Sequence, residues 1–235
     1  AQAVALAAKL HQIPAHIVMP TNAPVIKKQA VLDYGATVHP CAPNLLAREE
    51  VAAEVCKATG GLLIPPYDHP DVIVGQGTVG LELSEQTDGL DAVICPLGGG
   101  GLLSGVTLAM RSLHPEVPVF GVEPKGADDA ARSRKAGQFI PQTDPQTVAD
   151  GLRTSLGTWT WPVVRDLVSD VLVVDDTEII AAMRVIWERM KLVIEPSAAI
   201  GLAALLDPNF DPERQYQRVG IILSGGNMDL QKLPW

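Results

Sequence analysis

The most informative segment of the chain is Asp91-Ala-Val-Ile-Cys-Pro-Leu-Gly-Gly-Gly-Gly-Leu102. Its first half is an apolar strand, and the small apolar residues that follow Leu102 predict a helix after the glycines. Because glycine has no Cβ, four in a row let the backbone wrap closely around a ligand. The free N–H groups and the positive dipole end of the following helix favour an anion here. We interpret the loop as a phosphate cradle; a flexible glycine loop without a ligand is the alternative.

The composition limits the class of protein. The chain has 235 residues, of which 47% are hydrophobic and 19% charged, and its formal net charge is −9. This composition fits a globular protein with one large or two modest domains. Lys and Arg are scattered, so we expect no nucleic acid or anionic membrane as a partner. No apolar run approaches the roughly 18–20 residues that a membrane span needs.

The three cysteines, Cys41, Cys56 and Cys95, show no C-x-x-C spacing and lie in apolar surroundings. Disulfide frameworks and zinc sites use paired spacings that are absent here. We therefore expect buried thiols in a reducing compartment, and so a cytoplasmic protein.

Strands and helices alternate along the sequence. The expected helices include 45–59, 71–86, 102–113, 176–191 and 196–206, and the expected strands include 62–64, 91–96, 117–122 and 219–223. Such alternation indicates βαβ units, and hence an α/β fold with open parallel sheets and helices on both faces. The proline-punctuated loop at 65–70 predicts a boundary between a small domain, 1–68, and a large domain, 69–235.

The last predicted strand ends in Leu223-Ser-Gly-Gly-Asn227. Taken alone, this segment reads as a tight turn. It nevertheless places a hydroxyl and an amide at the carboxyl edge of the sheet, where open α/β sheets bind ligands. A second glycine loop at the same edge favours a ligand site over a simple turn.

Several short motifs follow one another in a specific order along nearly the whole chain. They include Ile17-Val18-Met19-Pro20, Tyr34-Gly35-Ala36, Gly75-Gln76-Gly77-Thr78, the glycine loop, Val122-Glu123-Pro124, Ile194-Glu195-Pro196-Ser197 and Leu223–Asn227. Each is weak alone. Together they resemble the fold type II pyridoxal-phosphate (PLP) enzymes, whose fold is tryptophan-synthase-β-like, and within them the serine racemase and serine/threonine dehydratase group. The resemblance implies racemisation or β-elimination of serine or a similar small hydroxy amino acid.

The resemblance also implies roles for individual residues. The PLP phosphate would lie on the backbone N–H groups of Gly98, Gly99, Gly100, Gly101 and Leu102, and Ser224 would face the pyridine nitrogen. A serine hydroxyl is a weak acid that leaves this nitrogen unprotonated, which suits α-proton removal better than transamination. Arg48 matches an arginine that reaches the substrate carboxylate. A solvated helix residue beside Glu49 and Glu50 is the other interpretation of Arg48.

A metal and a nucleotide are implied in the same way. Glu123, Asp129 and the Ala127 carbonyl would supply oxygen ligands, which suit Mg²⁺, Ca²⁺ or Mn²⁺. The alternative is a carboxylate cluster that a helix dipole stabilises. ATP, an activator at the subunit interface of a homodimer in this group, would contact four matching positions. These are Gln2, Tyr34, Lys191 and Asn227.

Two family motifs are missing from the sequence. One is a Ser-Phe-Lys segment whose lysine forms the Schiff base, and the other is a Ser-Ser-Gly-Asn-His loop that carries the second catalytic base in racemases. We therefore assign no catalytic residue within the chain and expect these groups upstream of Ala1. An omitted N-terminal portion, a portion on another chain, or a truncation without catalysis would each explain the absence, and we favour the first two.

Other functions stay open at this point. Tyr67-Asp68 departs from the mammalian racemase pattern, which keeps L-threonine and 3-hydroxyaspartate dehydratases as alternatives. A non-catalytic remnant that binds a phosphorylated ligand, or that pairs with an intact subunit, would also have the glycine loop without the lysine. An ordinary nucleotide-binding Rossmann domain fits less well, because the loop is not G-x-G-x-x-G.

Overall fold

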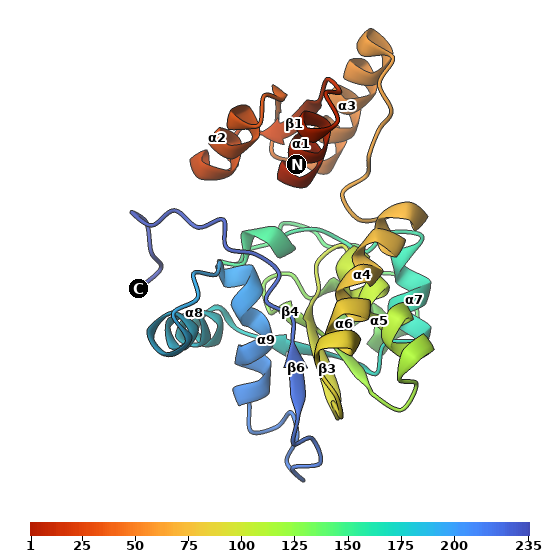
Figure 1. Cartoon of the computed structure of the whole chain (residues 1–235), viewed down its shortest axis with the longest axis vertical. Coiled ribbons are helices and arrows are strands. Elements are labelled where there is room, and N and C mark those ends of the chain that lie inside the picture. Colours follow the sequence, from red (N-terminus) through yellow and green to blue (C-terminus); the bar gives the residue numbers. More distant parts are fainter. The chain divides into compact units, whose positions relative to one another are not determined.

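The computed structural model describes the backbone of residues 1–235 and all side chains except that of Leu45. The chain forms two compact units, which are described separately (Figure 1). Unit 1 consists of Ala1–Pro65 and Asn227–Leu233, and unit 2 of Pro66–Gly226 and Pro234–Trp235. Among the described helices, none has the length and the apolar character that a membrane crossing requires.

Unit 1 is a small layer of helices on a two-stranded parallel sheet. Its elements are α1 (Gln2–Leu10), β1 (His16–Pro20), α2 (Val25–Asp33), β2 (Thr37–Cys41) and α3 (Leu45–Thr59). Ile17 pairs with Val38 in the sheet, and the core contains Ala5, Ile17 and Val31. The Asn44 side chain accepts a hydrogen bond from the Ala47 N–H and caps α3, which ends where Gly60 takes the left-handed conformation.

Unit 2 is a four-stranded parallel sheet between helices. Its elements are α4 (Pro70–Gln86), β3 (Ala92–Pro96), α5 (Gly101–Leu113), β4 (Val119–Pro124), α6 (Asp129–Ala136), α7 (Thr160–Asp166), β5 (Asp170–Val174), α8 (Asp176–Val185), α9 (Pro196–Leu206) and β6 (Val219–Ile221). A 3₁₀ turn spans Asp150–Leu152 and a π-helical turn spans Ile186–Met190. The strand order is β5-β4-β3-β6. The predicted α/β class with parallel sheets and helices on both faces is confirmed.

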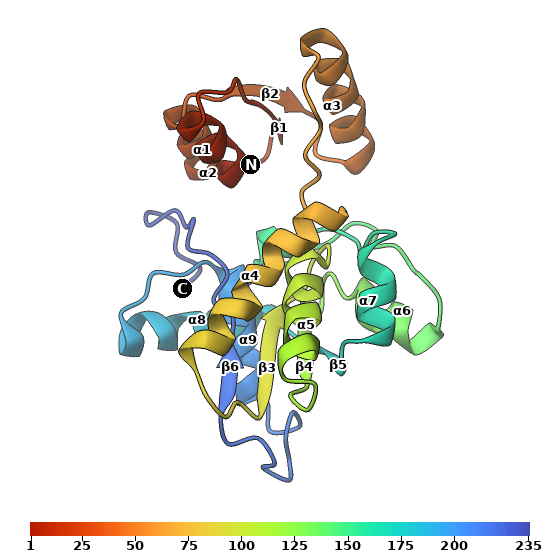
Figure 2. The same ribbon diagram turned by 45° about the vertical axis from the view of Figure 1, so that its right-hand side comes forward.

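Alternate side chains of β3 face different helices. Val93 and Cys95 belong to the core that packs against α5, whereas Ile94 faces α9 close to Gly201. Figure 2 shows α4 and α5 on one side of this sheet and α9 on the other. All five residues of β3 are buried, as expected for a parallel strand that is covered on both faces. This packing fixes the direction of β3 and therefore the position of the glycine loop that follows it.

Three expectations about local structure need correction. Leu62–Ile64 is not a strand but an irregular exposed segment, because a short apolar run forms a strand only where it finds a ladder partner. The helix expected at 176–191 changes to a π-helical turn at Ile186 and stops at Lys191, whose φ is +62°. Cys41 and Cys95 are buried free thiols, whereas Cys56 is only partly buried.

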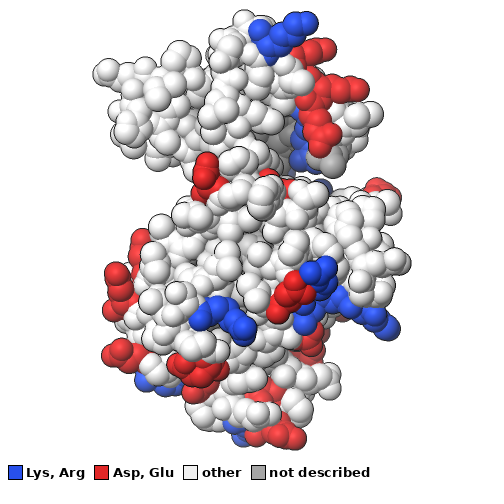
Figure 3. Space-filling model, turned by 90° about the vertical axis from the view of Figure 1, so that its right-hand side faces the viewer, with Lys and Arg blue, Asp and Glu red and all other residues white. Residues whose placement is uncertain are grey.

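On the face of the molecule shown in Figure 3, several acidic side chains gather together in unit 1. In unit 2, acidic and basic groups are scattered between wide uncharged areas. Over the whole of unit 2, basic groups form pairs with acidic ones, such as Arg132 with Asp128 at 2.7 Å and Arg184 with Glu188 at 2.7 Å. Exposed pairs of this kind contribute at most about 1 kcal/mol each to stability.

Candidate functional site

The glycine loop joins the end of β3 to the start of α5 at the carboxyl edge of the sheet. None of the described groups accepts a hydrogen bond from the backbone N–H groups of residues 98–103. Gly99, Gly100 and Gly101 are nevertheless buried. Buried backbone N–H groups almost always have an acceptor, and a helix N-terminus favours an anionic one. The loop therefore fits an anionic ligand such as a phosphate group.

Neighbouring side chains explain why the loop consists of glycines. A Cβ atom on Gly99 would collide with the ring of Tyr67, and one on Gly101 would lie 2.9 Å from the Tyr67 Cα. A Cβ atom on Gly98 would lie 3.0 Å from the Leu152 Cα. Gly100 has a φ of +88°, which disfavours every other residue type. Other parts of the chain therefore pack closely against the outside of the glycine loop. Residues larger than glycine in the loop would displace its N–H groups.

Ser224 follows β6, the strand that pairs with β3. Because β3 and β6 are parallel neighbours, the glycine loop and Ser224 leave the sheet at the same edge. Ser224 itself is exposed. The turn after it is held by Glu195, whose N–H donates to the Gly225 carbonyl at 3.1 Å. A hydroxyl at this position is available both to donate and to accept a hydrogen bond.

Glu123 and Asp129 form a buried acidic pair at the same edge, at the end of β4 and the start of α6. Both residues are 0% exposed. The Glu123 carboxylate accepts hydrogen bonds from the N–H groups of Ala130 at 3.0 Å and Ala131 at 2.9 Å. Asp129 Oδ2 accepts from the Leu156 N–H at 3.1 Å, whereas Asp129 Oδ1 is buried without a hydrogen-bond partner.

Burial and nearby negative charge make both carboxyl groups of this pair weaker acids. Burial, followed by the nearby charge of Asp129, raises the pKa of Glu123 to about 8. Burial also raises the pKa of Asp129 to about 6. A cation bound by oxygen ligands would relieve both effects. No group of three or more His, Cys, Asp or Glu side chains among the described residues is arranged to hold a metal, so the Ala127 carbonyl and water would have to complete the site.

Arg48 lies in unit 1, on α3. Its side chain is partly buried, and its Nε atom is buried without a hydrogen-bond partner. A buried guanidinium N–H without an acceptor is costly, and a carboxylate satisfies it with good geometry. The solvated-helix interpretation of Arg48 therefore fits the structure less well than an anion-binding one.

The four residues predicted for ATP belong to different units. Gln2, Tyr34 and Asn227 are in unit 1, and Lys191 is in unit 2. Lys9 Nζ lies 5.9 Å from the centre of the Tyr34 ring. Lys191 Nζ donates to the Glu188 carbonyl at 2.7 Å, which is the behaviour of a cation at a helix C-terminus. Among the described residues, no hydrogen bond joins any two of these four.

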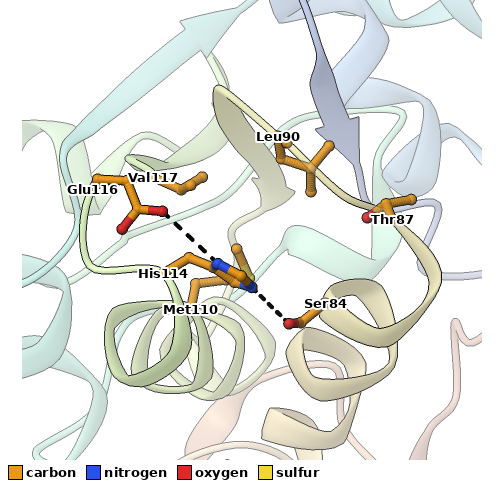
Figure 4. Close-up of a pocket in the computed structure, with 8 residues that line it drawn as sticks. Ser84, Thr87, Leu90, Met110, His114, Glu116 and Val117 are labelled. Carbon is orange, nitrogen blue, oxygen red and sulfur yellow. Dashed lines mark hydrogen bonds and ion pairs between the residues drawn. The ribbon is translucent and has the colours of Figure 1, made fainter.

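A second cluster of polar side chains lies at the amino edge of the sheet, opposite the glycine loop (Figure 4). Ser84 Oγ lies 2.7 Å from His114 Nε2, and His114 Nδ1 lies 3.8 Å from Glu116 Oε1. A serine, a histidine and a glutamate that contact one another in this order also form the catalytic triad of some hydrolases. Here the Glu116 side chain is 71% exposed, and the adjoining cavity of about 50 Å³ holds little more than water. We interpret this cluster as a link between the C-terminal ends of α4 and α5.

Comparison with protein families identifies the family of the chain. The family described as pyridoxal-phosphate dependent enzymes matches residues 1–225. The chain belongs to this family. The unsatisfied N–H groups of the glycine loop and the close packing around each glycine fit the phosphate end of that cofactor.

Individual members of the family are similar over nearly the whole chain. Serine racemase of Arabidopsis thaliana is 50% identical over 236 residues, which cover 99% of this chain and 71% of the relative. The beta-hydroxyaspartate dehydratase of Paracoccus denitrificans is 48% identical over 100% of this chain and 74% of its own length. Among solved structures, maize serine racemase superposes with a TM-score of 0.95 at 50% identity, covering 98% of this chain and 71% of that one.

Sequence reasoning missed the residues that surround the glycine loop. In the sequence, Tyr67 stands out only as a departure from a family pattern, but its ring packs on Gly99, and its hydroxyl lies 2.9 Å from Thr154 Oγ1. The sequence gives no sign of a role for Thr160. Tyr67 and Thr160 are both far from the glycine loop in the sequence. A local sequence pattern does not reveal contacts between such distant residues.

Proposed function

We propose that the chain provides the cofactor-binding part of a PLP-dependent enzyme that racemises or dehydrates serine or a similar small hydroxy amino acid. The observation that carries the proposal is the buried glycine loop with unsatisfied N–H groups in a member of this family. The names of the relatives, serine racemase and beta-hydroxyaspartate dehydratase, support the substrate class.

In this proposal the backbone N–H groups of Gly98 to Leu102 hold the phosphate. When bound, PLP withdraws electrons from the Cα–H bond of the amino acid that it carries. Ser224 would face the ring nitrogen, and its weakly acidic hydroxyl would leave that nitrogen unprotonated. Arg48 would bind the substrate carboxylate through its guanidinium group, including the Nε atom that lacks a partner.

A cation and a nucleotide are further parts of the proposal. Glu123, Asp129 and the Ala127 carbonyl would hold Mg²⁺, Ca²⁺ or Mn²⁺, supported by the buried, unpartnered Asp129 Oδ1. The resemblance alone supports ATP contacts at Gln2, Tyr34, Lys191 and Asn227, a homodimer and a cytoplasmic location. The covalent lysine of the family is left unassigned among the residues of this chain.

Binding of a cofactor analogue tests the proposal directly. We expect the 235-residue chain to bind 4′-deoxypyridoxine 5′-phosphate, which has the ring and phosphate of PLP without its aldehyde, in a saturable manner measured by fluorescence. Excess inorganic phosphate should displace it, and pyridoxine, which lacks the phosphate, should bind far more weakly. Absence of saturable binding, or equal binding of pyridoxine, would contradict the proposal.

A second measurement separates the enzyme from the non-catalytic alternative. The chain is mixed with PLP, reduced with borohydride and weighed by mass spectrometry, and a parallel sample is assayed for D-serine and pyruvate from L-serine. A single cofactor adduct with turnover supports an enzyme whose lysine is in the tested material. Binding without adduct or turnover favours a remnant that binds a phosphorylated ligand.

A further inference from the structure

Thr160 connects helix α7 to the glycine loop through a buried hydrogen bond. Its side chain is 0% exposed, and its Oγ1 donates to the Gly99 carbonyl at 2.8 Å. The same oxygen accepts from the Gly157 N–H at 2.8 Å. A hydroxyl has one proton, so donation to Gly99 and acceptance from Gly157 together fix its orientation. Figure 2 shows α7 beside α5, the helix that the glycine loop opens.

Fixing the Gly99 carbonyl also fixes the N–H of Gly100. The two groups belong to one planar trans peptide and therefore point in opposite directions. With the carbonyl held toward Thr160, the Gly100 N–H must point away from α7. This peptide lies between two glycines, the residues that hinder its rotation least. Without the threonine hydroxyl, we expect the peptide to sample other orientations.

Asp68 holds Thr160 in place. Its carboxylate accepts hydrogen bonds from the backbone N–H groups of Thr158 at 2.9 Å, Trp159 at 2.8 Å and Thr160 at 3.1 Å, and from the Thr158 hydroxyl at 3.0 Å. Asp68 directly follows Tyr67, whose ring covers Gly99. The segment Tyr67-Asp68 therefore packs on the glycine loop and also anchors Thr160, the residue that orients the loop.

We propose that Thr160 is a positioning residue for the phosphate cradle, which presets the Gly99–Gly100 peptide so that the Gly100 N–H faces the bound phosphate, and that Asp68 supports it. The inference rests on the proposed binding of a phosphate group by the glycine loop. It adds a residue that does not touch the ligand and acts through the backbone of Gly99.

The experiment compares three variants of the 235-residue chain in titrations with inorganic phosphate. Thr160→Val removes the hydroxyl at nearly constant volume, Thr160→Ser keeps it, and Thr107→Val is the matched control. Thr107 is a buried threonine of α5 whose hydroxyl has no hydrogen-bond partner. The second readout is the amide NMR signal of Gly100 in protein labelled with ¹⁵N-glycine, because a merely structural role would leave its response to phosphate intact.

We expect Thr160→Val to weaken phosphate binding about tenfold, the value of one lost hydrogen bond to a charged group, and to abolish the phosphate-induced shift of the Gly100 amide. Thr160→Ser should stay within about twofold of the parent, and Thr107→Val should match it. Unchanged affinity and an unchanged Gly100 response in Thr160→Val would overturn the inference, as would equal weakening by Thr107→Val.

Two further outcomes are distinguishable. If the parent chain binds neither phosphate nor the cofactor analogue, the proposed function is wrong. The inference about Thr160, which rests on that function, is then wrong as well. If Thr160→Val does not fold, as judged by circular dichroism, Asp68→Asn decides. It keeps the threonine hydroxyl but weakens its anchoring, so weaker phosphate binding supports the positioning role and parental affinity refutes it.

Discussion

The two edges of the sheet in unit 2 differ in whether polar groups find partners within the chain. At the carboxyl edge, the N–H groups of the glycine loop and Asp129 Oδ1 have no described partner although they are buried. At the amino edge, His114 is bonded to Ser84 and lies near Glu116 (Figure 4). Unsatisfied polar groups that gather at one edge of the sheet can receive a ligand, whereas groups that satisfy each other stabilise the fold. The difference explains why a triad-like cluster is the weaker candidate for a site.

The largest effect is expected from the acidic pair at the carboxyl edge. With EDTA present, the folded protein keeps a proton on Glu123 up to a pH of about 8, whereas the unfolded chain releases it near 4.5. The free energy of unfolding should therefore fall as the pH rises through this window, by on the order of 5 kcal/mol. Urea denaturation at several pH values measures it, and Mg²⁺ should restore stability at the alkaline end.

Substitutions at the two edges sharpen this test. Glu123→Gln removes the group that titrates at the alkaline end and should flatten the pH dependence above a pH of about 6, the pKa of Asp129. Glu116→Gln at the amino edge, where the side chain is mostly exposed, should leave the pH dependence unchanged. If the Glu123→Gln profile runs parallel to that of the parent, the pKa of Glu123 is not raised and the case for a cation at this position loses its support.

The next largest effect is expected at Gly100. Gly100→Ala would place a Cβ atom 2.8 Å from the Thr160 Cβ at a φ of +88°, and should weaken binding of phosphate or of the cofactor analogue at least about a hundredfold. Gly137→Ala is the matched control, because Gly137 has a φ of +69° but open space around it. It should cost about 1 kcal/mol of stability without changing phosphate affinity. Equal phosphate affinities in Gly100→Ala and Gly137→Ala would contradict the assignment of the ligand site to the carboxyl edge.

The sequence predicted the parts of this site that depend on local order. The strand before the glycines, the helix after them and the boundaries of α3 and α9 follow from apolar periodicity and from glycine or proline at the ends. The partners that shape the loop come from elsewhere. Thr160 is 61 residues away from Gly99, and Asp68 is 92 residues away from Thr160.

The errors have the same origin. Leu62–Ile64 has the composition of a strand, but a strand exists only with a neighbour that completes its hydrogen bonds, and the sequence does not state which segment that is. Burial of Glu123 was equally hidden, since a glutamate in a sequence gives no sign that both of its oxygens accept from one helix N-terminus. Tertiary contacts decide these features, and they change the chemistry of the residue as well as its position.

The smallest effect is expected at the amino edge, and it completes the comparison. Ser84→Ala removes the partner of His114 Nε2, which is part-buried between α4 and α5. Loss of one such hydrogen bond should reduce the free energy of unfolding by about 1 kcal/mol. Since α5 also carries the glycine loop at its other end, an effect on phosphate binding would mean that the two edges are coupled through this helix. We expect the affinity for phosphate to be unchanged, because the first turn of α5 is held by Tyr67 and Leu156 rather than by its C-terminal end. A weakening of binding in Ser84→Ala would therefore contradict the assignment of separate roles to the two edges.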